Sequence, residues 1–391
     1  MDYRFTPEQE AFREDLKKFL SAELPKDQEQ GEEAGSDHEF QFARAFQKKL
    51  AARNWLVPHW PKQYGGSDMG IMEQVIMREE MAFQRAPIPD IFGVNMLGPV
   101  LMLYGSEEQK RQHLPGIASG EIMWCQGYSE PGSGSDLASL QTKAVRDGDD
   151  YVINGQKIWT SNAHRADWMF FLGRTDQEAP KHKGISFFLT PMKVPGVSTR
   201  PLISLAGQHG FNEVYFEDVR VPATNIVGEE NRGWYVGAAL LDFERSGIGS
   251  SAAARRSLQD LLAYCKEAGN NGANGGSPAV RHKLAELMIE TDVGRYLSYR
   301  VASMQARGQV PNYEASVAKC YLSELSQRMA GAGVNIMGLT GQLRPESKKW
   351  AKLQGQFSMT YMVTLGQTIA GGTSEIQRNI IAQRGLGLPR G

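Results

Sequence analysis

The chain contains the stretch Gln126-Gly127-Tyr128-Ser129-Glu130-Pro131-Gly132-Ser133-Gly134-Ser135-Asp136 directly after an apolar segment, Ile122 to Cys125. The apolar segment predicts a buried strand, and the glycines and hydroxyl side chains that follow predict a loop. Backbone N–H groups left uncovered by glycine, together with serine hydroxyls, can hold a polar heterocycle or an anion. The same stretch is also compatible with an ordinary turn-rich loop.

Further strands are predicted on the C-terminal side of this loop. Tyr151 to Ile153 runs into Asn154-Gly155, a pair typical of tight β-hairpins. Three more runs rich in apolar and aromatic residues follow, with glycines and prolines between them: Trp168 to Leu172, Ile185 to Leu189 and Val214 to Phe216. This pattern is typical of a small antiparallel barrel or sandwich, which we expect over residues 121–232.

Helical periodicity dominates on both sides of the strand region. Thr6, Pro7 and Gln9 predict a capped helix start, and apolar residues recur at helical spacing across 41–53 and 71–84. After Gly233 the pattern predicts one long helix from Trp234 to Glu267, a Gly/Asn-rich loop, and helices over 280–307, over 313–338 and near the end. We therefore predict a multidomain α+β chain with an N-terminal helical domain (1–120), a middle β-domain (121–232) and a C-terminal helical bundle (233–391).

Composition excludes several functional classes. The 391 residues carry 43 Lys+Arg and 44 Asp+Glu, a net charge of −1, so no charge surplus favours nucleic acid or anionic lipid. No apolar run approaches the ~20 residues of a membrane span. The three cysteines lie far apart and the histidines form no close ligand pair, so we expect no metal site. The acidic N-terminal segment does not have the composition of a targeting peptide, which points to the cytoplasm.

Two other motifs could serve a ligand. In Asn154 to Asn162, Trp159 beside Thr160 and Ser161 could shield one face of an aromatic cofactor, although a core tryptophan would give the same pattern. In Gly371 to Asn379, Thr373 or Ser374 could cap a helix whose free N–H groups face a diphosphate or a carbonyl. An ordinary glycine loop and cap would also explain this segment.

One further motif is interpreted as a false match. Gly247-Ile248-Gly249-Ser250-Ser251-Ala252 satisfies G-x-G-x-x-A, with Glu267 near the distance expected for an acidic partner. A dinucleotide-binding fingerprint requires a strand before the glycines and a helix after them. Here the glycines fall inside the predicted long helix, so we expect small residues for close packing instead.

The motifs occur together, in one order, on a helix–strand–helix layout that resembles the acyl-CoA dehydrogenase family. The resemblance covers the whole chain and is sharpest across 124–175, 210–248 and 366–391. It implies a middle antiparallel β-barrel domain, a C-terminal four-helix bundle and FAD between them. It also implies α,β-desaturation of an acyl-CoA thioester, as in β-oxidation of fatty acids, with a carboxylate removing the α-proton and the β-hydride passing to flavin N5.

The same resemblance assigns roles to particular residues. Glu244 stands just before Arg245, where the isovaleryl-CoA and long-chain subfamilies place the catalytic base; many other members place it at the position of Gly371. The residues expected at the flavin are Gln126, Tyr128, Ser129, Trp159, Thr160, Ser161, Thr373, Ser374 and Glu375. Those expected at the acyl-CoA are Ser135, Asp242, Arg245, Gly371 and Gly372.

The expected partners follow from the resemblance as well. Electrons would pass to an electron-transferring flavoprotein, and the chain would form a homo-oligomer, dimer or tetramer, or a heteromer with a related chain. The sequence as a whole most resembles bacterial dehydrogenases that act on dicarboxylyl-, branched or sterol-derived acyl-CoAs. Two alternatives remain open: a flavin monooxygenase or oxidase on the same scaffold, and a partner subunit without activity of its own.

Overall fold

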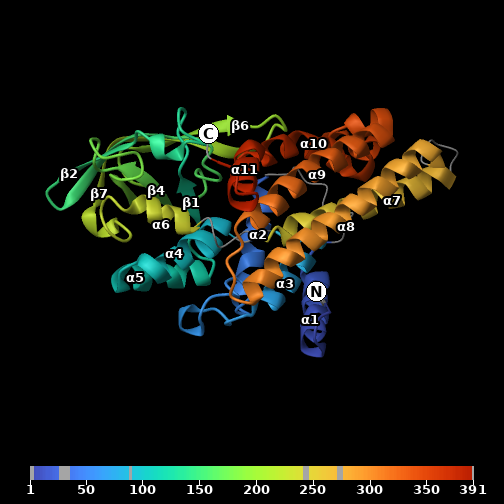
Figure 1. The fold of residues 1–391 in the computed structure, drawn as a ribbon, viewed down its shortest axis with the longest axis horizontal. Helices are drawn as coiled ribbons and strands as arrows, with labels where there is room; N and C mark the ends of the chain where they lie inside the picture. The colour runs from blue at the N-terminus through green and yellow to red at the C-terminus, as the bar shows by residue number, and fades with distance from the viewer. Residues whose placement is uncertain (1–3, 26–35, 88–89, 241–245, 271–275, 390–391) are drawn as a thin grey trace. The chain divides into compact units, whose positions relative to one another are not determined.

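The computed structural model describes residues 4–25, 36–87, 90–240, 246–270 and 276–389. The chain divides into two compact units, which are described separately. The helical unit comprises Met1–Glu39, Gly70–Ile88 and Arg245–Gly391, and the sheet unit comprises Phe40–Met69 and Pro89–Glu244. The fold is α+β: N-terminal helices, a middle curled β-sheet and a C-terminal helical domain (Figure 1).

The sheet unit is built on one sheet with strand order β1-β4-β2-β3-β7-β6, and β5 pairs with β4. β1 runs parallel to β4, and β2 touches β4 through the single parallel pair Lys143↔Arg174. The other strand pairs are antiparallel. The expected antiparallel domain therefore also contains parallel pairing. The strands are β1 (Trp124–Gly127), β2 (Lys143–Asp147), β3 (Asp150–Lys157), β4 (Trp168–Arg174), β5 (Ile185–Pro191), β6 (Val197–Ile203) and β7 (His209–Pro222).

Alternation of buried and exposed residues explains why these segments form a curled sheet. Along β7, Val214, Phe216, Val219 and Val221 are buried, and the residues between them are more exposed. These side chains share one core with apolar residues of β3, β4 and β5. The helices of this unit are α4 (Gly98–Tyr104), α5 (Glu107–Ala118) and α6 (Gly233–Leu240).

The hairpin predicted at Asn154-Gly155 is wrong. β3 continues through both residues, with a register shift between Ile153 and Gly155, and the turn that joins β2 to β3 lies at Gly148, where φ is +64°. A Cβ at Gly155 would lie 2.6 Å from Thr142 Oγ1. The glycine therefore permits a close strand approach at a bulge rather than a tight turn.

Helices fill the helical unit. They are α1 (Pro7–Glu23), α3 (Ile71–Phe83), α7 (Ile248–Asn270), α8 (Pro278–Ala306), α9 (Tyr313–Met337), α10 (Gln356–Gln367) and α11 (Ser374–Ile380); α2 (Asp37–Ala51) begins in this unit and ends in the sheet unit. Short 3-10 helices cover Lys62–Tyr64, Leu137–Ser139, Ala223–Asn225, Gly338–Gln342, Pro345–Trp350 and Lys352–Gly355, and π-helical segments cover Phe92–Leu97 and Ile381–Gly385. α7, α8 and α9 pack on one another (Figure 1) around Leu258, Leu287 and Leu325.

Two expectations about helix boundaries have different outcomes. Thr6 caps α1 with the predicted capping box to Gln9. The single helix expected from Trp234 to Glu267 is wrong, because α6 and α7 are separate and Gly247, with φ of +68°, directly precedes α7. The G-x-G-x-x-A motif thus lies at a helix start, and the preceding element among the described residues is the helix α6, so the described structure does not give it the strand that a dinucleotide-binding fingerprint requires.

Candidate functional site

Two of the segments singled out from the sequence meet in the sheet unit. The Ile158 N–H donates to the Ser129 carbonyl at 2.9 Å, where the chain leaves β3. The Lys157 ammonium donates to the Tyr128 carbonyl at 3.3 Å. The loop after β1 and the tryptophan segment are therefore one structural site.

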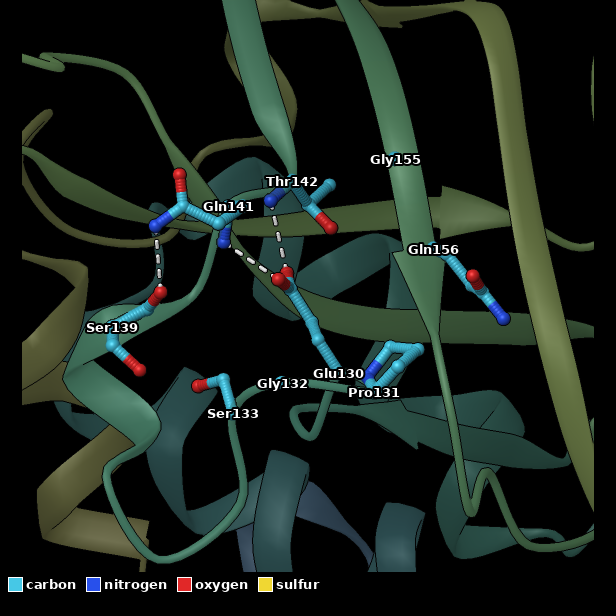
Figure 2. Close-up of a pocket in the computed structure, with 9 residues that line it drawn as sticks. All are labelled: Glu130, Pro131, Gly132, Ser133, Ser139, Gln141, Thr142, Gly155 and Gln156. Carbon is cyan, nitrogen blue, oxygen red and sulfur yellow. Dashed lines mark hydrogen bonds between the residues drawn. The ribbon is translucent and has the colours of Figure 1, made fainter.

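A buried ion pair fixes this junction. Lys157 Nζ lies 2.7 Å from Glu130 Oε1, and Lys157 is 0% exposed. The Glu130 carboxylate also accepts the backbone N–H groups of Gln141 (2.6 Å) and Thr142 (2.9 Å), as Figure 2 shows. Burial by itself would raise the pKa of Glu130, but the Lys157 charge and these hydrogen bonds hold it below its ordinary value. Burial lowers the pKa of Lys157 to about 8.

Sequence reasoning did not single out this pair. Glu130 lies in the first quoted motif and Lys157 in the tryptophan motif. Opposite charges in two motifs assigned to one site are the sequence signal that could have predicted this ion pair. An open pocket of about 480 Å³ lies beside Glu130 (Figure 2). It is lined by Glu130, Pro131, Gly132, Ser133, Ser139, Gln141, Thr142, Gly155 and Gln156. Its lining is mixed polar and apolar, and Ser135 is not one of the lining residues.

Trp159 adopts a strained and exposed conformation. Its φ is +59°, in the left-handed region that bulky residues rarely occupy, and its side chain is 59% exposed. The indole meets the Phe211 ring edge-on, with centroids 6.1 Å apart. Such strain costs on the order of 1–3 kcal/mol and persists only where the surroundings impose it. The alternative interpretation of Trp159 as a core residue is therefore wrong.

Its neighbours offer polar groups to a ligand. Thr160 is 1% exposed, and its Oγ1 has no hydrogen-bond partner among the described residues. Ser161 and Ser129 are half-buried. A buried hydroxyl without a partner is costly, so a ligand atom at this position would be stabilising.

Tyr128 and Gln126 serve the packing of the sheet unit. The buried Tyr128 hydroxyl donates to the Gly237 carbonyl of α6 at 3.3 Å, and burial raises the pKa of Tyr128 well above its usual range. Gln126, half-buried on β1, lies with Nε2 3.9 Å from Met96 Sδ. The Tyr128 side chain is thus committed to α6, which leaves its backbone for any cofactor contact.

Ser135 lies in the exposed part of the loop. A Cβ at either neighbouring glycine, Gly132 or Gly134, would meet open space. At the end of the loop Lys181 pairs with Asp136 at 2.5 Å, with both residues exposed. Ser135 is thus accessible to a ligand.

The glycine-rich tail forms a capped turn in the helical unit. Thr373 caps α11 by accepting the Ile376 N–H at 3.2 Å, as predicted. Gly371 and Gly372 have φ of +64° and +87°. Lys319 Nζ donates to the Gly372 carbonyl at 2.6 Å, and Gln377 Nε2 donates to the Gly371 carbonyl at 3.1 Å.

The residues after the cap differ in exposure. Ser374 is buried and Glu375 is exposed in the first turn of α11. Hydrogen bonds from its own backbone N–H and the Thr373 side chain lower the pKa of Glu375. Glu375 therefore adds a negative charge at the helix start.

The remaining expected residues have no structural description. Glu244, Asp242 and Arg245 lie outside the described residues. Within the described ranges, no cluster of His, Cys, Asp or Glu could hold a metal ion, and no helix is long and apolar enough to cross a membrane.

The residues present fit an aromatic cofactor with polar edges. In the sheet unit, an exposed indole supplies a flat surface and Thr160 supplies a buried hydroxyl without a partner among the described residues. The isoalloxazine part of FAD is an aromatic ring system with polar edge atoms, so this donor set matches its chemistry.

Comparison with known proteins finds family models that match nearly the whole chain. The model of the acyl-CoA dehydrogenase N-terminal domain matches residues 6–121, that of the middle domain 125–219 and that of the C-terminal domain 231–386. The chain is 38% identical over 364 residues to acyl-CoA dehydrogenase IpdE1 of Mycobacterium tuberculosis, covering 91% of each chain.

Solved structures agree with this result. The chain is similar to the Tcur3481-Tcur3483 steroid ACAD, with a TM-score of 0.91, 36% identity and full coverage of both chains. It is also similar to the ChsE4-ChsE5 complex of Mycobacterium tuberculosis, with a TM-score of 0.89 and 36% identity over 100% of both chains.

Proposed function

Because the chain belongs to the acyl-CoA dehydrogenase family of FAD-dependent oxidoreductases, we propose that it desaturates an acyl-CoA with Glu244 as the base for the α-proton. In this proposal Asp242, Arg245 and Ser135 contact the acyl-CoA, and Gly371 and Gly372 leave space where other members carry the base. We place the reaction in the cytoplasm, with an electron-transferring flavoprotein as the acceptor.

The observation that carries this proposal is the conformation of Trp159. An indole that is 59% exposed, on a backbone with φ of +59°, is a poor arrangement for stability alone. It is well suited to cover one face of an isoalloxazine ring. Thr160 Oγ1, buried and unpaired among the described residues, would donate to an edge atom of that ring.

The other assigned residues hold and align the reactants. When bound, FAD accepts the hydride that leaves the β-carbon of the acyl-CoA. Ser129 and Ser161 border the same site, and Thr373 to Glu375 would hold the nucleotide part of the cofactor. Glu244 takes the α-proton, and alignment of the base with the acyl-CoA supplies a large part of the rate enhancement. A guanidinium at Arg245 would keep Glu244 ionised.

We propose a bulky acyl group, in the chemical class of steroid-derived acyl-CoAs. Support comes from the resemblance to a steroid ACAD over the full length of both chains. We also propose a heteromer with a related chain as the working assembly, since the ChsE4-ChsE5 structure is named as a complex. A screen of acyl-CoAs that differ in length, branching and ring content, with an artificial electron acceptor, tests the substrate class.

The test of the mechanism is Glu244→Gln. The variant should keep FAD and bind acyl-CoA, but its flavin should bleach about 10²–10⁴-fold more slowly on substrate addition, because one positioned base is lost. Glu267→Gln, a change at an exposed glutamate on α7, is the matched control and should bleach at the wild-type rate. Bleaching of Glu244→Gln at the wild-type rate would show that another acid, in this chain or in a partner, is the base.

A further inference from the structure

Two histidines and an asparagine form a hydrogen-bonded set next to Trp159. The rings of His164 and His209 stack with centroids 3.9 Å apart and an interplanar angle of 17°. Asn212 bonds to both: Oδ1 lies 2.9 Å from His209 Nε2, and Nδ2 lies 3.1 Å from His164 Nδ1. Asn212 is 0% exposed, so its amide depends on these partners rather than on water.

The same asparagine binds the backbone of the tryptophan segment. Asn212 and Thr160 exchange both backbone hydrogen bonds at 3.0 Å, and Asn212 Nδ2 donates to the Thr160 carbonyl at 3.1 Å. The Asn162 N–H donates to the Gly210 carbonyl at 2.9 Å. The start of β7 thus holds the chain at Thr160 and again at Asn162, directly after the left-handed Trp159.

Hydrogen-bond chemistry fixes the orientation of every member of this set. The Thr160 carbonyl can only accept, so the Asn212 side chain must present Nδ2 to it, and Oδ1 must face His209. His164 Nδ1 therefore accepts, and His209 Nε2 donates. Both amide hydrogens and the amide oxygen of Asn212 are then used, which leaves no competing arrangement of equal energy.

We propose that His164, Asn212 and His209 are positioning residues that keep the Trp159–Thr160 peptide in its strained conformation and so present the indole to the flavin. This inference rests on the proposed function, because it takes the Trp159 segment to be the flavin contact. The three residues act through Trp159 and Thr160. The strain at Trp159 needs compensation, and the hydrogen bonds of Asn212 supply it locally.

The acceptor on His164 is the most informative atom to remove. Without it, one N–H of the buried Asn212 amide loses its partner, and the amide must turn away from Thr160 or remain unsatisfied. A loss of about 1.4 kcal/mol, in the usual range for an unsatisfied buried donor, corresponds to tenfold weaker FAD binding if the distorted segment must be reordered by the cofactor.

The experiment compares His164→Phe with His164→Asn. Phenylalanine keeps an aromatic ring against His209 but has no acceptor, whereas asparagine returns an oxygen near the position of Nδ1. His182→Phe, the same change at an exposed histidine of the sheet unit, is the matched control. The FAD dissociation constant and the visible circular dichroism of the bound flavin are measured for each holoenzyme, together with kcat and KM.

We expect His164→Phe to bind FAD about tenfold more weakly with an altered flavin spectrum, and His164→Asn and His182→Phe to resemble the wild type. A fall in the melting temperature of His164→Phe without a change in FAD binding or flavin spectrum would overturn the proposal. If His164→Phe does not fold, His209→Phe is the second test, because it removes the partner of Asn212 Oδ1 at the opposite end of the amide. Unchanged FAD binding by His209→Phe would also overturn the proposal. A wild-type protein that binds no FAD would instead refute the proposed function.

Discussion

Glu130 and Lys157 form the buried ion pair on which the junction of the two site segments depends. Glu130→Gln should destabilise the fold by about 3–5 kcal/mol, because it leaves an uncompensated ammonium in the interior. The double change Glu130→Gln with Lys157→Met removes both charges and should recover much of that loss. Urea unfolding at neutral pH measures the free energy of unfolding of the wild type, the single variant and the double variant.

An exposed pair provides the control for this prediction. Arg111 and Glu108 lie 2.6 Å apart with both side chains 74% exposed. Glu108→Gln should therefore change the free energy of unfolding by less than about 1 kcal/mol. A similar effect for Glu108→Gln and Glu130→Gln would mean that burial does not govern the contribution of the inner pair.

The buried His113 should make the free energy of unfolding depend on pH below neutrality. It is 1% exposed, its ring meets Trp124 and Trp168 edge-on, and burial lowers its pKa from 6.5 to about 4. The unfolded chain therefore binds a proton between these values that the folded chain does not. The contribution of neutral His113 to the free energy of unfolding is fully present above pH 6.5 and is lost as the pH falls toward 4. At pH 5 about 2 kcal/mol of this free energy is lost.

His113→Phe should flatten this dependence between pH 7.5 and pH 5, because phenylalanine keeps the edge-on packing and does not titrate. The measured quantity is the difference in unfolding free energy between variant and wild type at each pH. This difference cancels the effect of Asp90, whose pKa burial raises to about 6 and whose contribution therefore runs in the opposite direction. Parallel pH profiles for the two proteins would contradict the assignment.

At the scale of elements, the packing of α9 on α10 depends on one glycine. A Cβ at Gly333 would lie 2.1 Å from Cδ1 of Phe357, which is 2% exposed on α10. Gly333→Ala should therefore destabilise the helical unit by about 1–3 kcal/mol, since the ring cannot move within a packed core. Thermal unfolding followed by circular dichroism measures the effect.

Gly331 on the same helix is the matched control. Its Cβ would meet only Tyr361 Cε2 at 3.8 Å, an ordinary contact. Gly331→Ala should stabilise the helix by about 0.5–1 kcal/mol, because alanine loses less backbone entropy than glycine. Destabilisation of equal size at both glycines would show that α10 does not contact α9 as described.

Helices and strands with a clear period were predictable, and elements set by distant contacts were not. α3, α8 and α9 lie within a few residues of their expected positions, because apolar spacing alone specifies a buried face. The break before α7 depends on one glycine backbone, and the bulge at Gly155 depends on Thr142, which directly precedes β2. Local sequence contains neither piece of information.

The same distinction applies to the candidate site. The segments of Trp159 and Ser129 were singled out from residue type and resemblance, and the hydrogen bond from Ile158 to Ser129 brings these two segments together. The Glu130–Lys157 pair and the set around Asn212 join residues that are distant in sequence. Such pairings require the register of the sheet, which the sequence pattern does not specify. The roles of all the assigned flavin and acyl-CoA residues, Trp159, Thr160 and Ser129 as much as Glu244, and the domain boundaries 1–120, 121–232 and 233–391 stay predictions.

At the scale of the whole molecule, cofactor binding should be coupled to folding. The residues proposed to contact the flavin, Ser129, Trp159 and Thr373, lie far apart in the sequence, so only the folded chain can bring them to one ligand. A ligand that binds only the folded chain stabilises it by about 2.7 kcal/mol at 100 times its dissociation constant. Added FAD should therefore raise the melting temperature of the FAD-depleted protein, and the rise should follow the FAD concentration.

FMN is the informative control for this last prediction, because it shares the isoalloxazine ring but lacks the adenylate that Thr373 to Glu375 are expected to help hold. FMN should raise the melting temperature much less than FAD at equal concentration. Neither cysteine nor histidine occurs in Tyr128-Ser129, Trp159–Ser161 or Thr373–Glu375, so attachment should be noncovalent and denaturation should release intact FAD. Equal stabilisation by FMN and FAD would show that Thr373 to Glu375 do not bind the adenylate part of FAD. Flavin that stays with the denatured chain would show a covalent link at another residue.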